Sequence, residues 1–220
     1  QVSMSDRYIP ALGFAGLTSI YDPVVRWTTR EATFKSRLVE QADICAGHRV
    51  LDLGCGTGTL TMMLKRRQPT AAIVGLDGDP EVLELAARKA RAAGVEVALD
   101  RGTVDHLPYS SGSFDRVVSS LVFHHLSRDK KRAALHELFR VLRPGGQLHI
   151  ADWGQPHGPV MRAAFVIVQL IDGFATTTDN VQGRLPDFMR EAGFADARES
   201  QRLRTPLGTI AFCASRLPST

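Results

Sequence analysis

Short apolar runs alternate along the chain with segments whose apolar positions repeat at helical spacing. The apolar runs lie at 49–53, 72–77, 95–99, 115–121 and 147–152. Most are almost continuously apolar, as expected of strands that are buried on both faces. Strands that alternate with helices are typical of a parallel sheet covered by helices on both sides, so the pattern predicts a doubly wound, Rossmann-like α/β fold.

Two of the intervening segments carry clear helix signals. Asp79 can cap a helix that has Pro80 at its first position, and the apolar stripe that follows ends at Gly94. The segment 129–142 also has helical spacing. It is followed by Pro144-Gly145, which favours a type II turn because proline presets one central residue and glycine tolerates the positive φ of the next.

The ends of the chain add further elements. A helix is predicted at 25–42, ahead of the first strand, with Phe34, Leu38 and Ala42 on one face. After the last parallel strand we expect two helices and an intervening polar loop, followed by two strands that pair antiparallel. The helices are expected at 160–174 and 185–192, the loop at 175–183, and the strands at 195–202 and 207–215.

Composition and charge exclude several classes of protein. The 220 residues are 44% hydrophobic and 23% charged, as in an ordinary globular domain. The net charge of +4 comes from scattered basic residues without interleaved aromatic side chains, so nucleic-acid binding is not expected. The three cysteines form no metal-binding pattern and favour a reducing, cytoplasmic setting. Charged residues interrupt the apolar stretch 160–174, which argues against a membrane span.

The strongest local signal is a buried strand that runs into the glycine-dense turn 54–58 and then a helix. Such a turn lets backbone approach a ligand closely, and the helix N-terminus offers free N–H groups to an anion. Asp77 ends the next strand, where a carboxylate can bind ribose hydroxyls. Thr59 stands where a dinucleotide fingerprint needs its third glycine, and Asp52 would repel a pyrophosphate, so NAD is disfavoured. A tight turn without any ligand is the alternative.

Four ordered motifs make the chain similar to a known family. They read VLDLGCGTG, GLDGDPEVLELAARKA, LPYSSGSFDRVVSSLVFHHL and ELFRVLRPGGQLHIADW. Over about residues 21–152 the chain resembles the class I S-adenosylmethionine-dependent methyltransferases, particularly the ubiquinone/menaquinone biosynthesis C-methyltransferases and other small-molecule methyltransferases. The resemblance implies a mostly parallel seven-strand sheet with an antiparallel C-terminal hairpin. It divides a single domain into an N-terminal helical lid region (1–44), a cofactor-binding core (45–153) and acceptor-side helices with the hairpin (154–220).

The resemblance also implies which residues bind the cofactor. The glycine turn would line its methionine part with Asp52 near the amino group, Asp77 would hold the ribose, and the later strand ends would border the adenine and the sulfonium. Two positions depart from the family pattern, because Thr103 stands in place of an aspartate and Gly78 in place of an apolar residue. The implied set is Tyr21, Asp52, Gly54, Cys55, Gly56, Asp77, Gly78, Thr103, Val104, Ser119, Ser120 and Leu121.

Candidate catalytic residues follow the fourth and fifth strands. His124 and His125 lie just beyond a strand's carboxyl end, where ligands of open α/β sheets bind, and His124 is our candidate general base. The alternative is that both histidines only pack locally. Asp152 and Trp153 also point toward the expected pocket, and Tyr21 is a candidate lid residue.

These observations predict methyl transfer from S-adenosylmethionine to a small, partly apolar acceptor by a monomer or homodimer without a metal. Whether O, N, C or S is methylated stays open. A non-catalytic module that binds a nucleoside cofactor is the alternative function, and an NAD-dependent dehydrogenase is a more distant one.

Overall fold

The computed structural model describes residues 30–219, apart from the side chains at 160, 164, 167, 171 and 172. Its strands are β1 (Arg49–Leu53), β2 (Ala72–Asp77), β3 (Ala98–Arg101), β4 (Phe114–Ser120), β5 (Leu142–Trp153), β6 (Ala195–Thr205) and β7 (Gly208–Arg216). Its helices are α2 (Glu31–Ala42), α3 (Thr59–Arg67), α4 (Pro80–Ala92), η1 (Phe123–His125), α5 (Arg128–Val141), α6 (Pro159–Asp172), α7 (Phe174–Val181) and α8 (Leu185–Glu191).

The strands form one seven-stranded sheet in the order β3-β2-β1-β4-β5-β7-β6. The pairs from β3 to β5 are parallel, whereas β7 lies antiparallel between β5 and β6. The predicted mostly parallel sheet with a C-terminal antiparallel hairpin is therefore confirmed. The chain moves outward from β1 to β3 and then crosses back to β4, so β1 and β4 are neighbours whose connections diverge. Their carboxyl ends flank the crevice where ligands of such sheets bind.

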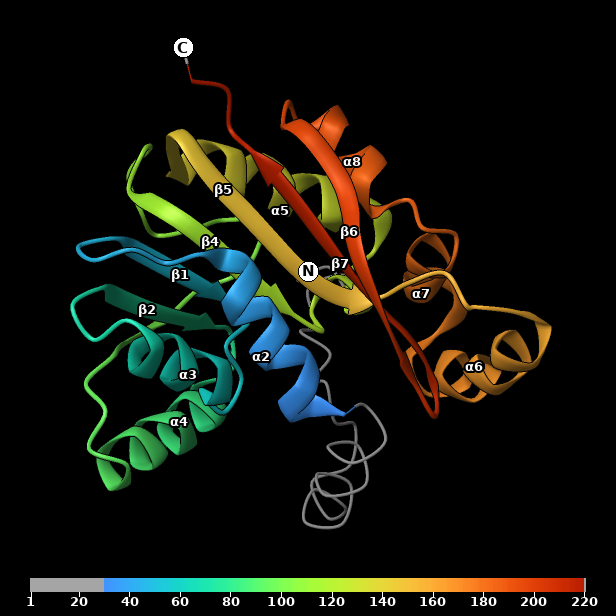
Figure 1. Ribbon diagram of the computed structural model, residues 1–220, viewed down its shortest axis with the longest axis horizontal. Helices are drawn as coiled ribbons and strands as arrows, with labels where there is room; N and C mark the ends of the chain where they lie inside the picture. The colour runs from blue at the N-terminus through green and yellow to red at the C-terminus, as the bar shows by residue number, and fades with distance from the viewer. Residues whose placement is uncertain (1–29, 220) are drawn as a thin grey trace, which may run out of the picture.

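Alternating side chains divide the core between the two faces of the sheet. Val50 belongs to one apolar cluster and Leu51 to the other, as the twofold period of a strand requires. One cluster contains side chains of α2 and α3, and the other contains side chains of α5 and α8. Figure 1 shows α2 in front of the sheet and α5 and α8 behind it. Helices therefore cover both faces, as predicted.

Three elements differ from the sequence predictions. Strand β5 begins at Leu142 and so includes Pro144 and Gly145, where a turn was predicted. The polar segment 175–183 was predicted to be a loop, but Phe174–Val181 is helical because Thr177, Asn180 and Val181 are buried by neighbouring elements. The strand predicted at 95–99 instead spans Ala98–Arg101. Its first residues close α4, since the Val95 N–H donates to the carbonyl of Ala90.

His149 on β5 is a buried titratable group beneath α2. Its Nδ1 lies 3.3 Å from the Gln41 amide nitrogen, and its Nε2 lies 3.2 Å from the amide oxygen of Gln147. These partners fit a neutral ring, because one nitrogen accepts a hydrogen bond and the other donates one. Burial, and then the charge of Arg116, lower the pKa of His149 to about 3.

We expect His149 to make the protein less stable at mildly acidic pH. The pKa is lower in the folded state than in the unfolded state, so its contribution is fully present above about 6.5 and is lost as the pH falls toward 3. At pH 5 the loss relative to pH 8 should be about 2 kcal/mol. Urea unfolding of wild type and His149→Gln at both pH values measures it. An equal loss in the two proteins would contradict this assignment.

Candidate functional site

The loop after β1 is held against β2 by its own backbone. The N–H groups of Gly54 and Cys55 both donate to the carbonyl of Leu76, at 2.8 and 3.0 Å. Gly54, Gly56 and Gly58 have φ values of 67°, 54° and 74°, a region that side-chain-bearing residues rarely adopt. The predicted glycine turn therefore lies at the carboxyl end of β1, at the switch point between β1 and β4.

The three glycines meet different surroundings. A Cβ at Gly54 would overlap the Val122 side chain, and one at Gly58 would lie 3.1 Å from the Cβ of Ala86. Both positions are constrained by packing within the protein. A Cβ at Gly56 would meet no described atom within 4 Å. Gly56 is thus the point at which open space reaches the backbone of the loop.

The carboxylate of Asp77, at the end of β2, binds this same glycine. Its Oδ2 accepts the Gly56 N–H at 2.9 Å, and its Oδ1 accepts the Asp79 N–H at 3.0 Å. Each carboxylate oxygen has a second acceptor site, and Asp77 is only partly buried. The carboxylate therefore faces the glycine turn and retains acceptor capacity for hydroxyl groups of a ligand.

Asp52 on β1 is a fully buried acid with one oxygen unsatisfied. Its Oδ2 accepts the Thr61 hydroxyl at 2.7 Å, whereas its Oδ1 has no hydrogen-bond partner among the described residues. Burial raises the pKa of this carboxyl to about 6, and the Thr61 hydrogen bond offsets part of that effect. An unpaired buried carboxylate is costly unless a donor or a cation reaches it. The site therefore fits the ammonium group of an amino acid.

The carboxyl end of β4 lies across from the glycine turn. The Ser119 hydroxyl is fully buried and donates to the carbonyl of Leu53 at 3.0 Å, which ties β4 to β1. Ser120 and Leu121 are partly exposed. Leu121 has a φ of 57°, and its N–H donates to the carbonyl of Ala151. A strained backbone of this kind is retained only where surrounding contacts impose it. Here Leu121 directly precedes Val122, whose side chain packs against Gly54.

The residues expected beside adenine lie near the end of β2. Gly78 follows β2 directly, and the Gly102 N–H donates to the carbonyl of Asp77 at 3.0 Å, which brings the loop 102–104 alongside. The Thr103 side chain is exposed, while Val104 packs against the core. Tyr21, the candidate lid residue, lies outside the described residues.

His124 and Asp152 form a buried pair at the ends of β4 and β5. His124 Nδ1 lies 2.7 Å from Asp152 Oδ1, and the two residues are 3% and 1% exposed. Asp152 also accepts the backbone N–H groups of Phe123 and Trp153, both at 2.7 Å. The sequence indicated His124 and Asp152 separately. Their proximity could have been predicted from the strand order, because His124 lies just past the carboxyl end of β4 and Asp152 lies at the carboxyl end of the adjacent parallel strand β5.

The contact with His124 changes the pKa of the Asp152 carboxyl group. Interaction with His124, together with backbone donors, lowers the pKa of Asp152 despite the opposing effect of burial. Trp153, by contrast, packs edge-on against Phe165 at a ring-centroid distance of 5.2 Å and belongs to the apolar core. The indole of Trp153 is therefore part of the apolar core that packs beside His124.

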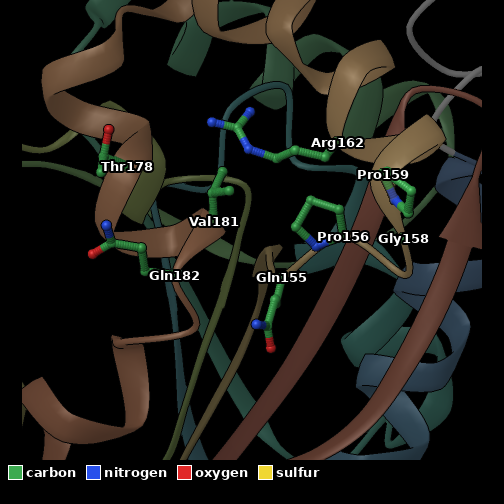
Figure 2. Close-up of a pocket in the computed structure, with 8 residues that line it drawn as sticks. All are labelled: Gln155, Pro156, Gly158, Pro159, Arg162, Thr178, Val181 and Gln182. Carbon is green, nitrogen blue, oxygen red and sulfur yellow. The ribbon is translucent and has the colours of Figure 1, made fainter.

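A groove of about 460 Å³ lies between the connection that follows β5 and helix α7. Figure 2 shows Gln155 and Pro156 on one side of it, Val181 and Gln182 on the other, and Arg162 reaching across from α6. The lining mixes apolar and polar side chains. All of it comes from the segment 154–185, to which no cofactor role is assigned by the sequence.

Comparison with known sequences finds similarity to a family in the core of this chain. Residues 50–146 match the family described as "Methyltransferase domain". The demethylmenaquinone methyltransferase of Thermus thermophilus is 42% identical over 123 residues, which are 56% of this chain and 55% of that protein. The chain spans about half the length of the curated relatives it matches.

Solved structures share the fold across a longer stretch. The S-adenosylmethionine-dependent methyltransferase SibL superposes with a TM-score of 0.72 at 22% identity, over 93% of this chain and 60% of that one. The [4+2]-cyclase SpnF superposes with a TM-score of 0.67 at 19% identity, over 86% and 82% of the two chains. The chain is thus similar, through its residues 50–146, to the methyltransferase domain family, and the described structure shares the fold of these solved proteins.

Proposed function

We propose that this protein transfers the methyl group of S-adenosylmethionine to a small, partly apolar acceptor. The observation that carries the proposal is the hydrogen bond between Asp77 and Gly56, because it sets a carboxylate with spare acceptor sites beside open backbone at the switch point of the sheet. The family match over residues 50–146 supports the same activity.

The cofactor-binding residues have roles that follow from their surroundings. We propose that Asp52 holds the ammonium group with its unpaired oxygen, that the backbone of Gly54, Cys55 and Gly56 lines the methionine part, and that Asp77 holds the ribose. Gly78, Thr103 and Val104 would border adenine. Because Thr103 is exposed and Gly78 has no side chain, the adenine would be held mainly by backbone and by packing on Val104.

The bound cofactor supplies an electrophilic methyl group on a sulfonium, so the protein has to align the acceptor and exclude water. Ser120 and Leu121 lie at the end of β4, where we propose that they border the sulfonium. The buried Ser119 acts indirectly, by fixing β4 to β1. We propose that Tyr21 contributes from the lid region.

His124 is proposed as the general base for an acceptor that must lose a proton. Asp152 accepts the hydrogen on Nδ1, which fixes the tautomer and leaves Nε2 as the basic nitrogen. The same carboxylate stabilises the protonated ring once it forms. The base is needed for a hydroxyl or an acidic carbon, but not for a thiol that is already ionised.

Two other functions remain alternatives. SpnF, a [4+2]-cyclase, shares this fold, so the fold alone does not establish the reaction. A non-catalytic module would bind the cofactor but release no methyl group to any acceptor. An NAD-dependent dehydrogenase is disfavoured because the unpaired oxygen of Asp52 would repel a pyrophosphate.

We propose three structural parts with separate tasks: 1–44 as a lid, 45–153 as the cofactor-binding core and 154–220 as the acceptor side. The groove of Figure 2 lies entirely in the third part. Within residues 30–219 no helix is long and apolar enough to cross a membrane. We propose a cytoplasmic monomer or homodimer that binds small molecules and no nucleic acid.

Calorimetric titration with S-adenosylmethionine and S-adenosylhomocysteine tests the cofactor. Both should bind, and Asp77→Ala should weaken binding by about 1–3 kcal/mol through lost charged hydrogen bonds. Asp100→Ala is a matched control, since Asp100 lies near the end of the neighbouring strand β3 and accepts the Tyr109 hydroxyl instead. Absence of heat with either compound would exclude the proposal, and unchanged affinity in Asp77→Ala would remove Asp77 from the site.

Asp52→Asn should separate stability from binding. The folded-state pKa is raised, so ionisation opposes folding above about 6, and at pH 8 the variant without cofactor should gain up to about 3 kcal/mol. Cofactor affinity should fall in the same variant. Wild-type affinity should also fall as the pH drops through about 6, whereas the affinity of the variant should not. Asp115→Asn, at a buried acid at the amino end of β4 and so at the opposite end of the strands, should leave affinity unchanged.

His124→Gln should lower kcat by about 10²- to 10⁴-fold without changing cofactor affinity. The assay follows labelled methyl transfer to the phenol, quinol, thiol or amine that gives turnover. His125→Gln is the control, because His125 is adjacent but exposed. Equal rates in wild type and His124→Gln, or equal losses in both variants, would show that His124 is not the base.

A further inference from the structure

Asn180 on α7 is a buried amide that makes no hydrogen bond to the residues that the structure describes. It is 2% exposed, and neither its Nδ2 nor its Oδ1 has a partner among them. The buried polar side chains beside it are satisfied: Thr177 accepts from Gln169 at 3.1 Å, and Asp179 accepts from Arg128 at 2.6 Å. The unsatisfied amide is therefore a property of Asn180 and not of the helix as a whole.

An unpaired buried amide opposes folding, since both its donors and its acceptor lose hydrogen bonds to water. A leucine has a similar size and lacks this penalty. Buried polar groups of this kind in a folded protein call for an explanation, and a ligand that pairs with the amide is one. Asn180 lies in the acceptor-side segment, where a ligand other than the cofactor would bind.

The position of α7 brings Asn180 toward the His124–Asp152 pair. Helix α7 contacts η1, which contains His124, and also contacts β5, which carries Asp152. The buried Lys131 connects the same elements, because its ammonium donates to the Thr176 carbonyl at 2.5 Å and feels the charges of both Asp179 and Asp152. Asn180 lies between Asp179, whose carboxylate is 3.7 Å from the Lys131 ammonium, and Val181, which belongs to the same apolar cluster as Trp153, so it lies on the side of α7 that faces this region.

We propose that Asn180 recognises the methyl acceptor by contacting a neutral group that both donates and accepts hydrogen bonds, such as a hydroxyl on an apolar ring. The inference rests on the proposed function. An amide offers donors and an acceptor, and one hydroxyl satisfies both kinds. An ether can only accept, so it would leave the Asn180 oxygen unpaired. Because Asn180 and His124 are both buried, the acceptor reaches them only when α7 moves away from η1.

The test compares 1-naphthol, whose hydroxyl can donate and accept hydrogen bonds, with 1-methoxynaphthalene, whose ether oxygen can only accept. Calorimetry measures the binding of each compound with S-adenosylhomocysteine present. Wild type should bind 1-naphthol about tenfold more tightly than 1-methoxynaphthalene. Asn180→Leu should abolish this preference by weakening 1-naphthol binding alone. The same variant without ligands should melt a few degrees higher, since an unpaired amide is removed. Gln201→Leu loses an exposed amide on β6, away from α7 and the groove, and should keep the preference.

Equal affinity of wild type for the two compounds, or no binding of 1-naphthol, would overturn the inference. An equal loss for both compounds in Asn180→Leu would also overturn it, as would a lower melting temperature of that variant. Titration of S-adenosylhomocysteine alone is the separate check on the proposed function. If that compound fails to bind, the proposed function fails, and the inference about Asn180 fails with it because it rests on that function. If the compound binds but one of the contradicting results above is obtained, only the inference about Asn180 fails.

Discussion

The N–H group of Gly56 donates to the carboxylate of Asp77, and the site depends on this hydrogen bond. It joins the loop after β1 to the end of β2 in addition to the contacts that Leu76 makes through its carbonyl. The bond holds the loop in a conformation that only glycine adopts readily, and it sets the carboxylate beside Gly56, where a Cβ would meet no described atom. Without it, the acid and the bare backbone would not form one binding surface.

Three features that oppose folding lie at the carboxyl ends of β1 and β4 or on the adjoining α7. Asp52 has an unpaired buried oxygen, Leu121 has a strained backbone, and Asn180 on the adjoining α7 has an unpaired amide. Each is costly in the isolated protein, and each lies where a ligand is proposed to bind. Asp152 differs, because His124 and backbone donors satisfy it. This distribution is typical of a site that is stabilised by what it binds.

The sequence predicted those parts of the structure that depend on local pattern. Buried strands such as Arg49–Leu53 are apolar throughout, and Asp79 with Pro80 marks the start of α4, where the side chain of Asp79 accepts from the Glu81 N–H. Helix α7 was missed because its sequence is polar and its buried face is created by tertiary contacts. A pattern of periodicity cannot reveal such contacts.

The candidate site was predictable to the same extent. Gly54–Gly58 and Asp77 are brought together as expected, since both follow adjacent parallel strands. The pairing of His124 with Asp152 follows from the strand order, which places β4 beside β5. Asn180 could not have been found, because neither its burial nor its lack of partners is visible without coordinates.

The most direct measurement is a crystal structure of the protein with S-adenosylhomocysteine. The account predicts the ribose hydroxyls on the Asp77 carboxylate and the amino group of the ligand on Asp52, with the glycine turn unchanged. A ligand bound elsewhere, or an Asp77 carboxylate turned away from both the ligand and Gly56, would contradict it.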